Sequence, residues 1–232
     1  MVHFTVKTNR LPTDTRLTFF LLALVLLGGF LSARANTANQ VAPSAKDAEA
    51  IGVGTAAPDA DLRDLEGNEV TLHEIIAGKP TVLIFYRGSW CPYCNLHLSD
   101  LITVEEELRS LGYQIIAISP DRPEELNKMK AADHLNYRLF SDPKAEAMKK
   151  FGVAYQVDDA TVTNYKQKFN VDLERASGQT HHILPVPAVF ILDRGGKIAF
   201  VHADPDYKVR MKGAEVLAAA KTAATTSDAL QK

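Results

Sequence analysis

The two cysteines of this chain lie three positions apart, in the segment Cys91-Pro92-Tyr93-Cys94. Proline is favoured at the first position of a helix, where no backbone N–H is needed, so we expect a helix to begin at Pro92 with Cys91 as its N-cap. Unpaired N–H groups and the helix dipole would stabilise a thiolate there and lower the pKa of Cys91 below the free value of about 8.5. Because the thiolate is the reactive form, Cys91 is the expected nucleophile.

Cys94 is expected one helical turn later on the same face, at a Cα separation of about 5–6 Å that a disulfide tolerates. A disulfide across so short a loop adds little stability through loop entropy, so we expect it to open and close. A stabilising disulfide and a metal site that includes His97 are the alternatives, although the metal site lacks an obvious second pair of ligands. Haem attachment is excluded, because Asn95 and not histidine follows Cys94.

The segments on either side of the cysteine motif predict the elements that position it. Residues 81–86 form a short apolar run rich in β-formers, which is typical of a strand buried on both faces. From Pro92 to the expected stop at Gly112, leucine and valine recur at spacings of three and four, which predicts an amphipathic helix. Residues 115–118 predict a second buried strand. The cysteines therefore lie at the strand-to-helix junction of a parallel βαβ unit, a position typical of redox-active pairs.

The rest of the chain predicts further short strands and helices. These are a hairpin at Glu66-Gly67-Asn68, a helix after Pro123, a strand over 138–140, a helix from Pro143 to Phe151, a hairpin of 189–192 with 198–201, and a closing helix over 215–220. Together they predict an α/β fold with a mixed sheet covered by helices on both faces.

Composition excludes several classes of protein. The chain has 232 residues, of which 46% are hydrophobic and 23% charged, so it can build a packed core. A net charge of −2 without basic blocks argues against a nucleic-acid partner. Two cysteines are too few for a disulfide scaffold, and the pattern indicates no cofactor.

The amino terminus predicts export. Basic residues, an apolar run over 19–30 and Ala33-Arg34-Ala35 are the pattern of a secretory signal peptide over 1–35, cleaved near Ala35. The alternative is a membrane anchor over 17–31, which is shorter than the roughly 20 residues that a spanning helix needs. We expect a flexible leader over 36–50, a folded domain over 51–222 and a frayed tail over 223–232. The cleaved chain would carry a net charge of −5 and lie in the periplasm or outside the cell, without stable membrane insertion.

Several segments carry a family resemblance. They are residues 81–98, Ala117-Ile118-Ser119-Pro120-Asp121, Leu139-Phe140-Ser141-Asp142-Pro143, Phe151-Gly152-Val153 and residues 186–193. Over residues 51–220 the chain resembles the peroxiredoxin-like (AhpC/TSA, redoxin) branch of the thioredoxin-fold superfamily. The resemblance implies a thioredoxin-like fold with peroxiredoxin-type extensions.

The resemblance also implies roles for particular residues. Cys91 would be the peroxidatic cysteine, Cys94 its resolving partner, and Pro187 the cis-proline of the superfamily, opposite the cysteines. Residues 157–180 would be an insertion relative to a minimal thioredoxin. Val162, Tyr165 and Phe169 give that insertion helical spacing, so we expect a small packing helix there, with a lid as the alternative.

The cysteine motif departs from typical peroxiredoxins. In that family a hydroxyl residue three positions before the peroxidatic cysteine helps to orient the peroxide, and here Gly88 stands at that position. Ser89 is the nearest hydroxyl. Arg87 is the nearest guanidinium and could stabilise a thiolate or a peroxide oxygen, or be a solvated residue at a strand end. Trp90 could shield the thiol, present a docking surface or simply pack.

Three functions follow from these observations. The first is a thiol peroxidase, in which Cys91 attacks a hydroperoxide, Cys94 closes a disulfide and an external dithiol reduces it. The second is an exported thiol–disulfide oxidoreductase of thioredoxin type that acts on protein disulfides. The third and most remote is a copper carrier in which a histidine such as His202 joins the cysteines.

Overall fold

The computed structural model describes Met1, His3 and residues 40–230. The predicted signal peptide, its alternative as an anchor over 17–31 and the first residues of the expected leader lie outside these residues. None of the helices within residues 40–230 combines the length and the apolar character that crossing a bilayer requires.

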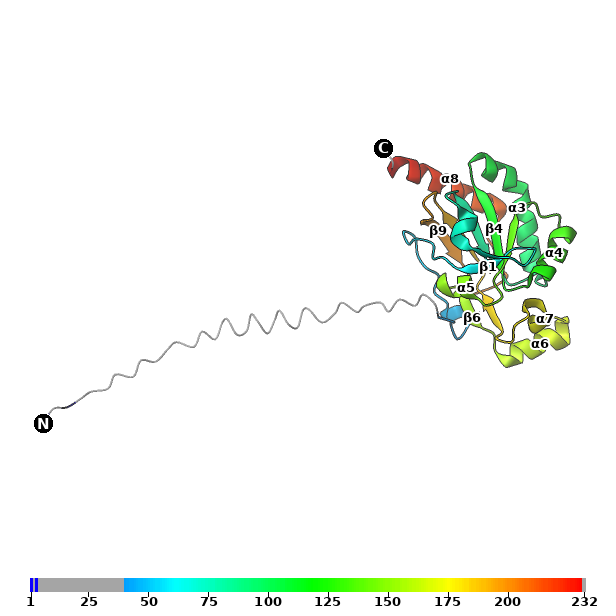
Figure 1. Cartoon of the computed structure of the whole chain (residues 1–232), viewed down its shortest axis with the longest axis horizontal. Helices are drawn as coiled ribbons and strands as arrows, with labels where there is room; N and C mark the ends of the chain where they lie inside the picture. Colours follow the sequence, from blue (N-terminus) through cyan, green and yellow to red (C-terminus); the bar gives the residue numbers. More distant parts are fainter. Residues whose placement is uncertain (2, 4–39, 231–232) are drawn as a thin grey trace. The chain divides into compact units, whose positions relative to one another are not determined.

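A mixed sheet forms the centre of the described chain (Figure 1). Its seven strands, counted within residues 40–230, follow the order β2-β1-β5-β4-β3-β8-β9. They are β1 (Asp61–Arg63), β2 (Glu69–Thr71), β3 (Thr81–Phe85), β4 (Gln114–Ser119), β5 (Arg138–Ser141), β8 (Ala188–Leu192) and β9 (Ile198–Ala203). The central strand β3 pairs in parallel with β4 and antiparallel with β8, so the predicted βαβ unit and the predicted mixed sheet are both confirmed.

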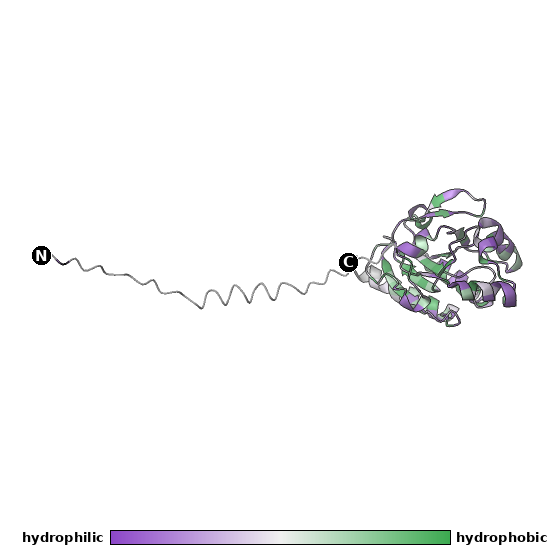
Figure 2. Cartoon of the chain, turned by 90° about the horizontal axis from the view of Figure 1, so that it is seen from below, coloured by the Kyte–Doolittle hydropathy of each residue, from purple (hydrophilic) through white to green (hydrophobic). Residues whose placement is uncertain are grey.

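Helices cover both faces of this sheet, as predicted. They are α2 (Leu72–Ile76), α3 (Pro92–Ser110), α4 (Pro123–Ala132), α5 (Glu146–Lys150) and α8 (Gly213–Leu230). Successive side chains of a strand point to opposite faces. Val82 and Ile84 therefore pack in the core under α3, α4 and α8, whereas Leu83 and Phe85 pack in the core under α2 and α5. The central strands β3 and β8 are buried throughout, and Figure 2 shows hydrophobic residues gathered in the middle of the sheet.

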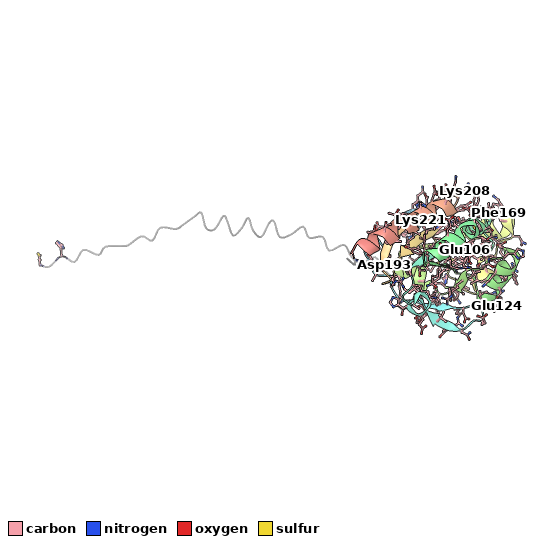
Figure 3. All side chains as sticks on the ribbon, turned by 90° about the horizontal axis from the view of Figure 1, so that it is seen from above. Glu106, Glu124, Phe169, Asp193, Lys208 and Lys221 are labelled. Carbon is pink, nitrogen blue, oxygen red and sulfur yellow. The ribbon has the colours of Figure 1, made fainter. Side chains whose placement is uncertain are left out.

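A smaller layer lies beside the cysteine motif and is built from the predicted insertion over 157–180 together with the short strands on either side of it. It contains β6 (Ala154–Gln156), α6 (Asp159–Phe169), α7 (Leu173–Ser177) and β7 (Ile183–Pro185), and β6 pairs antiparallel with β7. The predicted helix is confirmed as α6. Its Val162 and Tyr165 pack on a small cluster around Leu173, whereas Phe169 is 65% exposed and lies at the surface (Figure 3).

Both expected boundaries of the folded domain need correction. Residues 40–50 pack on the core instead of forming a flexible leader: a short 3-10 helix, η2 (Ala45–Asp47), brings small apolar side chains against it. The Ala42 N–H also donates to the Ala154 carbonyl at 2.9 Å. At the other end, α8 continues to Leu230 through the expected frayed tail. Alanine has the highest helix propensity, and Ala223 is buried against the sheet.

Candidate active site

Cys91 ends the connection from β3 and is the N-cap of α3, with Pro92 in the first helical turn, as predicted. The backbone N–H groups of Cys94 and Asn95 both donate to the Cys91 carbonyl, at 3.0 and 3.1 Å. Both cysteines are free thiols. Cys91 is 1% exposed and Cys94 0% exposed, so the pair lies beneath the surface.

The pKa values of the two thiols shift in opposite directions. A hydrogen bond with Cys94, together with the charges of Arg87 and Arg210, outweighs burial and lowers the pKa of Cys91 to about 6. Burial, reinforced by the hydrogen bond to Cys91 and its charge, raises the pKa of Cys94 well above its ordinary value. At neutral pH, Cys91 is therefore a thiolate and Cys94 a thiol that donates to it. The lowered pKa of Cys91 has the direction that the N-cap argument expected, but its largest cause is the hydrogen bond with Cys94, and the Cys91 side chain makes no capping hydrogen bond.

Arg87 is a buried cation beside this pair and not a solvated residue at a strand end. It is 3% exposed, and its guanidinium carbon lies 5.0 Å from the ring centre of Trp90, 5.5 Å from that of Tyr165 and 4.2 Å from that of Tyr207. Its Nη2 donates to the Tyr165 hydroxyl. Its Nε is buried and has no hydrogen-bond partner among the residues that the structure describes. The aromatic rings thus hold the charge near Cys91 and leave one donor available.

Gly88 cannot be replaced by the hydroxyl residue of typical peroxiredoxins. Its φ of +148° is a conformation that side chains rarely adopt. A Cβ there would lie 2.4 Å from Trp90 Nε1 and 2.9 Å from an oxygen of Asp121. The neighbouring Ser89 is held by the same carboxyl group, because its N–H donates to Asp121 Oδ2 at 2.5 Å and its hydroxyl also bonds to Asp121.

Asp121 is fully buried under this loop, at the end of β4 in the Ser-Pro-Asp motif. Burial raises its pKa to about 7, against the hydrogen bonds from Ser89, which lower it. Its Oδ1 has no hydrogen-bond partner among the described residues. Asp121 therefore fixes the loop that carries Cys91 through its hydrogen bonds with Ser89, and burial favours the protonated form of its carboxyl group.

Trp90 packs instead of standing free. Its ring centre lies 5.8 Å from that of Tyr165, so it joins the main core to the layer of α6 and α7 above the site. The expectation for Pro187 needs correction, because no residue in the described part of the chain has a cis peptide bond. The trans form is the ordinary isomer before proline.

Two residues of the site escaped the sequence analysis, and both come from the loop between β9 and α8. Tyr207 lies against the Arg87 guanidinium, and Arg210 Nη2 donates to Cys94 Sγ at 3.5 Å. Arg210 is 116 positions from Cys94 in sequence. Only the pairing of β8 beside β3, with β9 next to it, brings this loop to the cysteines.

The structure offers no support for the copper carrier. In the part of the chain that the structure describes, no three His, Cys, Asp or Glu side chains gather where they could hold a metal ion. His202 and His97 therefore do not complete a metal site with the two cysteines.

Comparison with known proteins adds a family to this geometry. The family model described as "AhpC/TSA family" matches residues 53–201. Peroxiredoxin Bcp of Escherichia coli (strain K12) is 31% identical over 100 residues, which cover 43% of this chain and 64% of the relative. A Mycobacterium tuberculosis protein that carries a provisional peroxiredoxin name is 27% identical over 160 residues, which cover 69% of this chain and 87% of the relative. The match to the Escherichia coli relative therefore spans less than two thirds of its length.

Solved structures share the fold. The crystal structure of peroxidoxin BcpB from Mycobacterium tuberculosis superposes with a TM-score of 0.55 at 20% identity and covers 78% of this chain and 99% of that one. At this identity the likeness supports the thioredoxin-like fold alone.

Proposed function

Because this chain belongs to the AhpC/TSA family, the peroxiredoxin-like branch of the thioredoxin fold, we propose that it is a thiol-dependent peroxidase. Cys91 and Cys94 are its redox-active pair. The observation that carries the proposal is the buried Cys91 thiolate, with a pKa of about 6, next to a protonated Cys94 and the Arg87 guanidinium.

The first step is attack by Cys91 on a hydroperoxide. The Cys91 sulfur bonds to the terminal peroxide oxygen, the O–O bond breaks, and the departing oxygen leaves as an alkoxide or hydroxide that takes up a proton. Cys91 becomes a sulfenic acid. Since Gly88 offers no hydroxyl, the unpartnered Arg87 Nε–H is the donor that we assign to the peroxide.

The second and third steps complete the cycle. The Cys94 sulfur attacks the sulfenic sulfur, the S–O bond breaks, and water leaves with the proton that Cys94 gave up. An external dithiol then reduces the disulfide by two thiol exchanges and is itself oxidised to a disulfide. The substrate is expected to be small, because a protein disulfide cannot reach a sulfur that is 1% exposed without opening of the site.

Turnover with an external dithiol tests this proposal. The reduced protein, hydrogen peroxide and dithiothreitol are mixed, and peroxide consumption is followed with time. We expect the wild-type protein to consume peroxide catalytically, and Cys91→Ser to add nothing to the rate of dithiothreitol alone. Consumption above that rate in Cys91→Ser, or a wild-type rate that never exceeds it, would overturn the assignment.

We also propose that the protein is exported and that residues 1–35 are removed. The proposal rests on the basic residues, the apolar run and the small residues around Ala35. Mass spectrometry of the protein from fractionated cells tests it. A chain that begins near Asn36 outside the cytoplasm supports export, and an intact chain in the cytoplasmic fraction contradicts it.

A further inference from the structure

Arg210 is the charged group in contact with the second sulfur of the pair. Its Nη2 donates to Cys94 Sγ at 3.5 Å, within hydrogen-bond reach of sulfur, and its Nη1 donates to the Val209 carbonyl at 3.1 Å. Two anchors at the end of one side chain fix the direction of the guanidinium. The backbone contact holds it in the loop, and the other contact aims it at Cys94.

No carboxylate among the described residues neutralises the charge of Arg210, which acts on both cysteines and is in contact with Cys94. None of the ion pairs among the described residues includes Arg210. Its Nε is buried and has no hydrogen-bond partner within residues 40–230. His97 lies close enough for burial and the Arg210 charge to lower its pKa to about 4, so this histidine is neutral and does not compete.

We propose that Arg210 is a catalytic residue that stabilises Cys94 as a thiolate in the two steps in which this sulfur carries negative charge. The proposal rests on the proposed peroxidase function and extends it. Nothing in the spacing of the cysteine motif or in the family resemblance assigns this role to the loop between β9 and α8.

The first of these steps is closure of the disulfide. Cys94 loses its proton, its sulfur attacks the Cys91 sulfenic sulfur, and the S–O bond breaks as hydroxide takes up a proton to leave as water. While Cys91 is a thiolate, the hydrogen bond to it and its charge raise the pKa of Cys94. Both causes disappear when Cys91 becomes a neutral sulfenic acid, and the Arg210 charge then opposes burial alone. Oxidation of Cys91 thus prepares Cys94 to ionise.

The second step is reduction of the disulfide by the external dithiol. One thiolate of the dithiol attacks Cys91 Sγ, the bond between Cys91 and Cys94 breaks, and its electron pair goes to Cys94 Sγ. The departing thiolate forms beside the Arg210 guanidinium and then takes up a proton. The second thiol of the dithiol releases Cys91, and the dithiol leaves as a disulfide. Stabilising the leaving thiolate accelerates exchange.

Several other groups face Cys94 and enter its pH dependence. They are Cys91 at the N-cap of α3, Tyr86 and Arg87 after β3, and, through Arg210, His97 on α3 and His202 on β9. Among these groups Arg87 is a guanidinium, and its charge acts on Cys91 as well. Arg210 donates the hydrogen bond to Cys94, and its removal leaves the Cys94 hydrogen bond and the Arg87 charge, which lower the pKa of Cys91 more strongly than Arg210 does.

The test separates the two steps in stopped flow. The reduced protein is mixed with excess hydrogen peroxide, and sulfenic acid formation and disulfide closure are followed by Trp90 fluorescence, with quenched samples analysed by mass spectrometry. The variants are Arg210→Met, Arg210→Lys and the control Lys212→Met, which removes an exposed cation two positions away. Circular dichroism confirms that each variant is folded.

We expect closure to slow by about 10- to 100-fold in Arg210→Met, since a hydrogen bond to a charged group contributes about 1.5–3 kcal/mol. Its rate should rise with pH beyond the point at which the wild type levels off. Arg210→Lys should recover a large part of the rate, and Lys212→Met should close at the wild-type rate. A wild-type rate and pH profile in Arg210→Met would overturn the role of Arg210, as would slow closure that Arg210→Lys does not relieve.

A second arm needs no peroxide and so separates this proposal from the proposed function. The disulfide is formed with diamide, and its reduction by dithiothreitol is timed in the same variants. We expect Arg210→Met to be reduced about tenfold more slowly than the wild type. If no sulfenic acid forms in any protein but this difference is found, the peroxidase proposal fails and Arg210 keeps its role. If Arg210→Met is unfolded, Arg210→Gln, which also removes the charge, takes its place in both arms, and wild-type rates and pH profiles in that variant contradict the proposal.

Discussion

The hydrogen bond from Cys94 is the largest cause of the low pKa of Cys91, and it can be removed without removing a charge. Cys94→Ser keeps an O–H donor at this position, whereas Cys94→Ala removes the donor at nearly the same size. Hydrogen bonds to charged groups contribute about 1.5–3 kcal/mol, which corresponds to about 1–2 pH units. We therefore expect the pKa of Cys91 to rise from about 6 to about 7–8 in Cys94→Ala and to stay near 6 in Cys94→Ser.

The consequence for reactivity follows from the thiolate fraction. With a pKa of about 6, roughly 90% of Cys91 is ionised at neutral pH, and this fraction falls to about 10–50% in Cys94→Ala. Each variant has a single cysteine, so the ultraviolet absorbance of the thiolate and the rate of alkylation by iodoacetamide both report Cys91 alone. The two titrations should differ by about 1–2 pH units. Coincident titrations would refute the hydrogen bond as the cause and leave the guanidinium charges in its place.

Three further predictions concern the loop and the layer above the cysteines. Gly88→Thr should lower the free energy of unfolding by about 2–4 kcal/mol. The reason is that the φ of Gly88 is +148° and that a Cβ there would collide with Trp90 and Asp121. Urea denaturation measures the change, and a value below about 0.5 kcal/mol would contradict this reasoning. Asp121 titrates at about 7 when folded and near 4 when unfolded, so stability is lost as the pH rises through this window. The stability of Asp121→Asn relative to wild type should therefore increase by about 1 kcal/mol per pH unit there, and a difference that is constant with pH would contradict the burial of the proton. Tyr165→Leu removes the tyrosine ring that packs on Trp90 and the hydroxyl that accepts from Arg87. Alkylation of Cys91 should therefore become faster, and the emission of the single tryptophan should shift to the red. An unchanged alkylation rate would argue against the idea that the layer of α6 and α7 covers Cys91.

Local patterns in the sequence predicted the elements nearest to the cysteines. The apolar run before Gly88 predicted a strand buried on both faces, because such a strand must be apolar at nearly every position. The structure confirms this, since β3 is buried throughout. Pro92 fixed the start of α3 in the same way, since proline suits the first turn and few later positions. The prediction that Cys91 is the nucleophile came from these two local features.

Features that depend on tertiary contacts could not be predicted in this way. The extended segment around Ala42 has no periodicity of its own, and its place is set by pairing with the chain at Ala154. Arg210 and Tyr207 lie in a loop without a motif, and the order of the strands alone brings them to Cys94 and Arg87.

The measurement that tests the central claim most directly is the rate at which Cys91 reacts with hydrogen peroxide. In Cys94→Ser no disulfide can form, so stopped flow and mass spectrometry follow a single step from thiolate to sulfenic acid. With the peroxide oriented by Arg87, we expect this thiolate to react at least about tenfold faster than the thiolate of free cysteine under the same conditions, with a sulfenic acid on Cys91 as the product. A rate equal to that of free cysteine would contradict the account and leave a low pKa thiol pair without peroxidase activity.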